Sequence, residues 1–139
     1  MHPTNNIDPT FKKSLNSARI NILESKIEIN DIIDNYEILI SDYSGIYVDY
    51  LLLNRSIVFA AFDLERYLAC DREMYYDYED VTPGPKCKNW KSVFDWVIKF
   101  RNDPTLYEDE RSDLKAKFHK YYDGKNSERV LGEILNLSN

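Results

Sequence analysis

Glycine and proline are scarce in this chain, which has four glycines and five prolines among 139 residues. This scarcity excludes collagen-like and low-complexity proteins, in which these two residue types dominate. Long hydrophobic runs are also missing, because no apolar stretch approaches the roughly 18 residues that a membrane-spanning helix needs. We therefore expect a globular protein that does not cross a bilayer.

Basic residues are outnumbered, since 18 Lys and Arg against 24 Asp and Glu give a formal net charge of −6. A general polyanion-binding surface depends on many Lys and Arg side chains that release counterions, so binding of nucleic acid is disfavoured. One local phosphate site remains compatible with this charge, because a helix N-terminus and one or two side chains are enough to bind a diphosphate.

Cysteine is rare as well. Cys70 and Cys87 are the two cysteines of the chain, they have no CxxC spacing, and no secretory hydrophobic segment precedes them. This pattern favours reduced thiols in a cytosolic protein over a disulfide bond.

The remaining composition suits a packed core, with 43% hydrophobic and 14% aromatic residues, enough for one domain. Candidate strands and helices alternate: strands at residues 20–23, 37–41 and 56–61, and helices at residues 30–36, 46–53 and 63–70. The last of these strands is continuously apolar, which is typical of a parallel strand buried on both faces. The alternation predicts an α/β fold with a parallel sheet of three or four strands and helices on both faces.

The second half of the chain is expected to be helical after an irregular segment. Residues 71–89 contain a proline on each side of Gly84, which fixes a turn and disfavours a regular element. Apolar residues at helical spacing then predict a helix that starts at Trp90 and stops at "RNDP". Two further helices are expected at about residues 106–121 and 127–137.

Four segments carry a family resemblance: "LISDYSGIYVDYLLLNRSIVF", "FDLERY", "YYDYEDVTPGP" and "YDGKNSERV". In their words, order and spacing they resemble the successive signatures of the CDP-glycerol glycerophosphotransferase family, the enzymes that build teichoic-acid type poly(glycerol phosphate) chains. The resemblance covers about residues 20–133.

This resemblance implies a GT-B glycosyltransferase fold, in which two Rossmann-like domains face each other across a cleft and the C-terminal domain holds most of the nucleotide donor. Residues 1–139 resemble the later part of that C-terminal domain, since the start Met1-His2-Pro3 is similar to the family's "K-x-H-P" segment. We therefore expect a partial donor-nucleotide-binding domain that lacks an N-terminal domain. A partial domain exposes apolar surface, so self-association is expected.

The candidate diphosphate site is at Ser44 and Gly45, between the second predicted strand and the apolar helix. The serine hydroxyl and the first helical N–H groups could bind a phosphate, helped by the helix dipole. The alternative is that Ser44 is an N-cap worth about 1 kcal/mol, with no ligand. The family commonly has a second serine at the position of Gly45, so this chain lacks one hydroxyl there.

Two further residues belong to the predicted site. Asp49 lies one turn into the helix and could accept hydrogen bonds from glycerol or ribose hydroxyls, or interact favourably with the helix N-terminus. His2 resembles a family catalytic residue, because an imidazole beside a leaving diphosphate could stabilise developing charge. The alternative for His2 is an unstructured residue beside the chain terminus. Asp42 is expected to cap the turn, and His119 to lie on the surface of a charged helix.

Other charged residues are expected near the predicted site. Asp63, Glu65 and Arg66 follow the third strand, at the sheet edge where ligands bind. Arg72 and Lys86 could add positive charge to a diphosphate pocket. The acidic residues of "DYED", residues 77–80, suggest a metal site, but neighbouring carboxylates on a loop do not converge on one ion. The resemblance implies no bound metal and no other cofactor.

The resemblance also implies a reaction. The terminal hydroxyl of a growing polyol-phosphate or lipid-linked acceptor attacks the β-phosphorus of CDP-glycerol and releases CMP. The base for the incoming hydroxyl is expected from the missing domain, so the chain alone should be inactive. The implied location is cytoplasmic, at the inner face of the cell membrane in the intact protein. Two alternatives remain: a non-catalytic nucleotide-binding or interaction module, and a GT-B transferase with another nucleotide-activated donor.

Overall fold

The computed structural model describes residues 20–23, 26–70 and 74–137. The chain divides into two compact units, residues 1–33 and residues 34–139. The described part of the first unit contains one short 3-10 turn, η1 (Ile29–Asp31), and the next turn, η2 (Ile33–Asn35), begins at its last residue. These two turns stand where a helix was predicted over residues 30–36.

The strand predicted at residues 20–23 is wrong, because this segment has no strand conformation. Ile20 and Leu23 are 45% and 42% exposed. So short an extended segment persists as a strand only when it is hydrogen-bonded to a neighbouring strand, and within the described residues nothing pairs with it.

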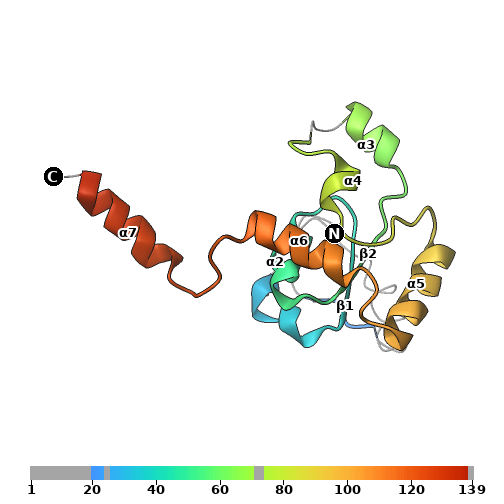
Figure 1. The fold of residues 1–139 in the computed structure, drawn as a ribbon. Helices are drawn as coiled ribbons and strands as arrows, with labels where there is room; N and C mark the ends of the chain where they lie inside the picture. Colours follow the sequence, from blue (N-terminus) through green and yellow to red (C-terminus); the bar gives the residue numbers. More distant parts are fainter. Residues whose placement is uncertain (1–19, 24–25, 71–73, 138–139) are drawn as a thin grey trace. The chain divides into compact units, whose positions relative to one another are not determined.

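The second unit is built on a small parallel sheet (Figure 1). Strands β1 (Ile38–Ser41) and β2 (Ser56–Phe59) run in parallel, with Ile38 opposite Ser56 and Ser41 opposite Phe59. Residues 85–87 run along the other side of β2: Phe59 N donates to Pro85 O (2.9 Å), and Cys87 N donates to Phe59 O (2.7 Å). In the described part of the chain the sheet therefore has two strands and a parallel bridge, fewer than the three or four strands predicted.

Strand β2 is buried on both faces, as its continuous apolar sequence predicts. Val58 packs with Val93 and Phe100 of α5 (Trp90–Asn102). On the opposite face, Phe59 contacts Tyr47 of α2 (Ile46–Tyr50), with ring centroids 5.4 Å apart. Because neighbouring residues of a strand point to opposite faces, helices cover both sides of the sheet, which confirms this part of the prediction.

The other predicted helices are present, with one addition. Helix α2 continues into the 3-10 turn η3 (Leu51–Leu53), and α3 (Leu64–Cys70), α6 (Glu108–Phe118) and α7 (Asn126–Leu137) match the predicted segments within a few residues. Helix α4 (Tyr78–Val81) lies in the segment that was predicted to be irregular, and Asp77 caps it by accepting a hydrogen bond from Glu79 N. In the loop that follows α4, Cys87 is buried with a free thiol, as the sequence predicts for this residue. Among the described helices, none combines the length and the apolar character needed to span a membrane.

Candidate functional site

The turn at residues 42–45 joins the carboxyl end of β1 to α2, as predicted. Within it, the carboxylate of Asp42 accepts a hydrogen bond from Ser44 N at 3.1 Å, which confirms the turn-capping role of Asp42. Ser44 and Gly45 are both exposed. The two predicted diphosphate-binding residues therefore lie at the carboxyl end of β1, where a ligand can reach them.

The interpretation of Ser44 as a helix cap is wrong. The N-cap of α2 is Gly45, and no side chain caps it. Within the described residues the Ser44 hydroxyl makes no hydrogen bond, and Val48 N is the first N–H of α2 to find a main-chain acceptor, Gly45 O. The hydroxyl of Ser44 and the N–H groups of residues 45–47 are therefore the donors that the turn and the start of α2 can offer to a ligand.

Gly45 has no structural reason to be glycine. Its φ of −67° is accessible to every residue, and an added Cβ would meet no atom within 4 Å. Asp49 lies one turn further on α2, on its exposed side, whereas Tyr47 and Tyr50 are buried. The structure thus brings Ser44, Gly45 and Asp49 to the exposed part of one short helix and its preceding turn. His2 lies outside the described residues.

Aromatic side chains from α3 and α4 hold the turn in place. The Tyr43 hydroxyl donates to the carboxylate of Asp63 at 2.6 Å, and the Tyr43 ring stacks on Tyr67 with centroids 4.0 Å apart and planes 7° from parallel. The Tyr78 hydroxyl donates to the backbone oxygen of Asp42 at 3.1 Å. The sequence predicts that Asp63 lies near the site, but it does not predict any of these contacts. Stacking between side chains so far apart in sequence leaves no local pattern.

Tyr43 should make the free energy of unfolding depend on pH in the alkaline range. Burial, followed by the hydrogen bond to Asp63, raises the pKa of Tyr43 from 10.0 to about 12. The folded protein then holds this proton more tightly than the unfolded chain, so the stabilisation is complete below pH 10 and is lost as the pH rises toward 12. We expect Tyr43→Phe to be less stable than the wild type at pH 9, and this difference to shrink at pH 11. Urea unfolding at both values measures it, and a pH-independent difference would contradict the assignment.

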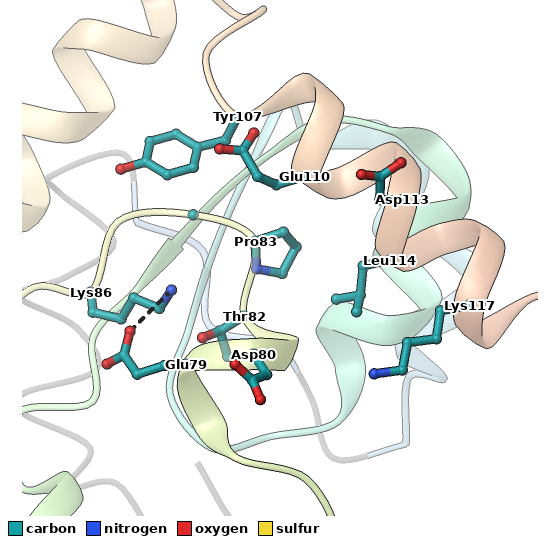
Figure 2. A pocket seen from close by; sticks show the side chains of 11 residues that line it. Glu79, Asp80, Thr82, Pro83, Lys86, Tyr107, Glu110, Asp113, Leu114 and Lys117 are labelled. Atoms are coloured by element: carbon teal, nitrogen blue, oxygen red, sulfur yellow. Dashed lines mark ion pairs between the residues drawn. The ribbon is translucent and has the colours of Figure 1, made fainter.

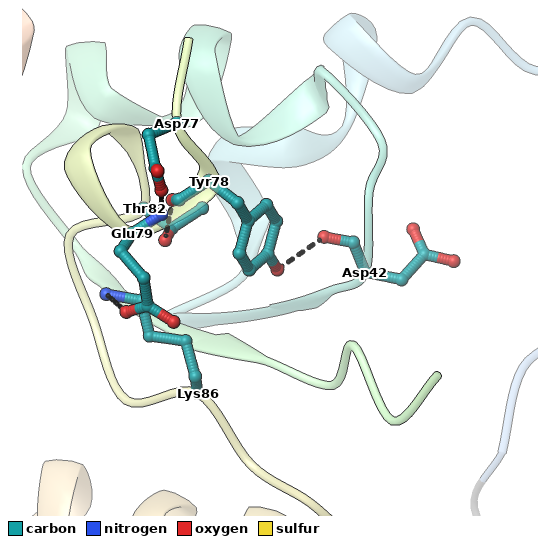
Figure 3. Close-up of polar contacts among 6 residues, drawn as sticks. All are labelled: Asp42, Asp77, Tyr78, Glu79, Thr82 and Lys86. Carbon is teal, nitrogen blue, oxygen red and sulfur yellow. Dashed lines mark hydrogen bonds and ion pairs between the residues drawn. The ribbon is translucent and has the colours of Figure 1, made fainter. Parts of the chain in front are cut away.

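The acidic segment at residues 77–80 serves to hold α4 (Figure 3). Asp77 caps the helix, and Glu79 forms an ion pair with Lys86, with Nζ and Oε2 3.4 Å apart. Lys86 thus directs its charge to a carboxylate of α4. Within the described residues, no group of three or more His, Cys, Asp or Glu side chains could hold a metal ion. Arg72 lies outside the described residues.

Two cavities lie elsewhere in the second unit. One, of about 420 Å³, lies between α4, the loop that follows it and α6, and mixes carboxylates with lysines (Figure 2); its charged side chains are Glu79, Asp80, Lys86, Glu110, Asp113 and Lys117. The other, of about 510 Å³, lies at the amino ends of both strands and includes Arg55 and Arg101. Neither cavity includes Ser44, Gly45 or Asp49. Ser44, Gly45 and Asp49 are exposed on the surface of the unit.

His119 is not the plain surface residue that its charged helix suggests. It is half-buried, and its Nε2 lies 2.7 Å from Val48 O of α2. Lys115 of α6 also donates to Leu52 O, at 3.2 Å. Helix α6 and the residue that ends it therefore contact α2 and the turn η3 that continues it.

Comparison with known proteins identifies the family. The sequence profile described as CDP-glycerol:poly(glycerophosphate) glycerophosphotransferase matches residues 1–136. The chain belongs to this family. The match includes the four segments that carry the resemblance. It also includes the turn at residues 42–45 and the elements α2, β2 and α4.

Curated members of this family are similar to most of the chain. The teichoic acid poly(ribitol-phosphate) polymerase of Bacillus spizizenii is 33% identical over 108 residues, which cover 78% of this chain and 17% of that protein. The ribitol-phosphate polymerase of Staphylococcus aureus is 35% identical, over 78% of this chain and 18% of that protein. The poly(glycerol phosphate) polymerase of B. spizizenii is 34% identical, over 86% of this chain and 32% of that protein. The chain thus spans less than a third of the length of these relatives, all three of which are polymerases by name.

Proposed function

We propose that this chain forms the donor-binding part of a transferase that moves glycerol phosphate from CDP-glycerol to a teichoic-acid type acceptor. Family membership supports this proposal, and the observation that carries it is the turn at residues 42–45. There an exposed hydroxyl without a partner among the described residues stands beside helical N–H groups, at the carboxyl end of a parallel strand. This edge is where open α/β sheets bind ligands.

In the proposed reaction, a terminal hydroxyl of the acceptor forms a bond to the β-phosphorus of CDP-glycerol. The bond from that phosphorus to the bridging oxygen breaks, and CMP leaves with the electron pair. The Ser44 hydroxyl and the Gly45 N–H would donate hydrogen bonds to the phosphate oxygens, and Asp49 would accept hydrogen bonds from donor hydroxyls. His2 would stabilise the leaving group. The proton of the incoming hydroxyl passes to a base that we place in another part of the full-length enzyme.

The larger architecture is also part of the proposal. The parallel pairing of β1 and β2, with helices on both faces, is compatible with a Rossmann-like domain. We place this chain in the C-terminal domain of a GT-B enzyme, with an N-terminal domain across the donor cleft. The acceptor would be a polyol phosphate or a lipid-linked primer, handled at the cytoplasmic face of the membrane.

Transfer of ribitol phosphate is the second candidate. The names of two of the relatives described above, at 33% and 35% identity, specify ribitol phosphate. A diphosphate-binding turn contacts the part of the donor that CDP-glycerol and CDP-ribitol share, so the turn does not select between them. Titration of the full-length protein with both donors separates the two candidates by their affinities.

Replacing Ser44 tests the proposed function. In the full-length protein, Ser44→Ala should weaken binding of CDP-glycerol by about 1 to 2 kcal/mol, the size of a hydrogen bond to a charged acceptor. Its melting temperature should stay unchanged, because the Ser44 hydroxyl caps nothing in the described structure. Calorimetric titration beside thermal melts measures both quantities.

A true helix cap provides the control for this test. Asn89 caps α5 by accepting a hydrogen bond from Ser92 N at 2.9 Å. Asn89→Ala should lower stability by about 1 kcal/mol and leave donor affinity unchanged. If Ser44→Ala behaves like Asn89→Ala, with a lower melting temperature and full affinity, the proposed phosphate contact is wrong.

A further inference from the structure

Two buried tyrosines hold the backbone just outside the two ends of β1. At the amino end, the Tyr50 hydroxyl donates to Tyr36 O at 2.7 Å. At the carboxyl end, the Tyr78 hydroxyl donates to Asp42 O at 3.1 Å (Figure 3). The side chains are equally well buried, since Tyr50 is 0% and Tyr78 is 4% exposed. The contacts are chemically alike, but only the one from Tyr78 is made to the turn that carries Ser44.

We propose that Tyr78 is a positioning residue for the diphosphate turn: its hydroxyl orients the backbone of Asp42, and Asp42 in turn orients Ser44. This inference rests on the proposed function. The route is direct, because the carbonyl of Asp42 accepts from Tyr78 while its carboxylate accepts from Ser44 N at 3.1 Å. Tyr78 thus sets the position of the proposed phosphate donors without touching the ligand itself.

Helix α4 is anchored firmly enough for this role. Thr82 Oγ1 donates to Tyr78 O at 2.5 Å, and Glu79 pairs with Lys86 at 3.4 Å. The loop that follows α4 is buried and lies against β2, where Gly84 fits directly over the carbonyl of Ile57. Since these contacts fix α4 to the central strand, the position of the Tyr78 hydroxyl is defined relative to the sheet.

The surroundings of the Tyr78 ring also fix its orientation. Its centroid lies 6.1 Å from that of Phe59 and 6.1 Å from that of Tyr43, the residue between Asp42 and Ser44. Burial raises the pKa of Tyr78 above its ordinary value, so the hydroxyl keeps its proton at neutral pH and remains a donor. Without this donor the Asp42 peptide can rotate, and the ligand then binds only the fraction of turns with the correct geometry.

The matched variants Tyr78→Phe and Tyr50→Phe test this inference in the full-length protein. Each removes one phenol hydroxyl that donates to a main-chain carbonyl, although Tyr36 O keeps a second donor in Arg55 Nη1, at 2.9 Å. We expect Tyr78→Phe to weaken CDP-glycerol binding about three- to tenfold. We also expect it to speed solvent exchange of the Ser44 amide by a similar factor. Tyr50→Phe should leave both within about twofold, whatever it does to the melting temperature.

Calorimetric titration and exchange NMR separate two kinds of failure. If Tyr78→Phe changes neither the Ser44 exchange rate nor the affinity, or if Tyr50→Phe changes both equally, Tyr78 does not position the turn. If the wild-type protein binds no CDP-glycerol while Tyr78→Phe still accelerates Ser44 exchange, the proposed function fails and the structural role of Tyr78 stands.

Discussion

Gly84→Ala should destabilise the protein by about 3 kcal/mol or more. A Cβ at this position would lie 2.4 Å from Ile57 O and 3.3 Å from Ile57 C, both of them backbone atoms of β2. A backbone atom of the central strand cannot rotate away as the end of a side chain can. The loop must therefore move off β2, and the two hydrogen bonds that join Phe59 to residues 85 and 87 are lost or strained.

Urea unfolding measures this loss, and Gly132→Ala is the control. Gly132 lies in α7, and an added Cβ there would meet nothing within 4 Å. In that variant, alanine should be neutral or stabilising by up to about 1 kcal/mol, because glycine is a poor helix former. Equal unfolding free energies for the Gly84 and Gly132 variants would show that the loop does not lie against β2 as described.

Gly45→Val should abolish binding of CDP-glycerol to the full-length protein, a loss of at least about a hundredfold, or about 2.8 kcal/mol. The reason is steric, because a β-branched side chain would stand where the proposed diphosphate approaches the backbone of the turn. The fold should be largely unaffected, since the backbone at Gly45 is ordinary and a Cβ meets no atom there. Calorimetric titration beside thermal melts checks both expectations.

Gly45→Ser is the matched control for this substitution. Serine adds a side chain at the same Cβ position but supplies a hydroxyl that can donate to a phosphate oxygen. We expect this variant to bind CDP-glycerol at least as tightly as the wild type. If valine and serine at this position leave the affinity equally unchanged, the phosphate does not approach Gly45.

The sequence predicts the elements of the second unit well because their signals are local. Residues 57–61 form a continuous apolar run, and the structure has β2 at Ser56–Phe59 with all four residues buried. Residues 20–23, three apolar residues and Asn21, are also a candidate strand but form none. The difference lies in pairing: β2 has hydrogen-bonded neighbours on both sides, whereas a short, mostly apolar segment reveals nothing about its partners.

The site is only partly visible in the sequence for the same reason. The turn at residues 42–45 follows from a strand that breaks at small polar residues before an apolar helix. The support of the turn by Tyr78 depends on α4, a four-residue helix too short for any periodicity to reveal. Arg111 is a similar case, because its charged helix suggests exposure, yet it is 1% exposed and donates to Leu106 O at 2.6 Å.

The segment at residues 85–87 also decides how the sheet can grow. Pro83 and Pro85 have no N–H groups, and Gly84 N already donates to Thr82 O. Residues 85 and 87 direct their bonded groups toward β2, so the outward edge of this segment offers few donors to a further strand. Such an edge is a poor template for edge-to-edge aggregation. Within the described residues no strand pairs with the other edge of β1, so a foreign strand that joins this sheet would pair there.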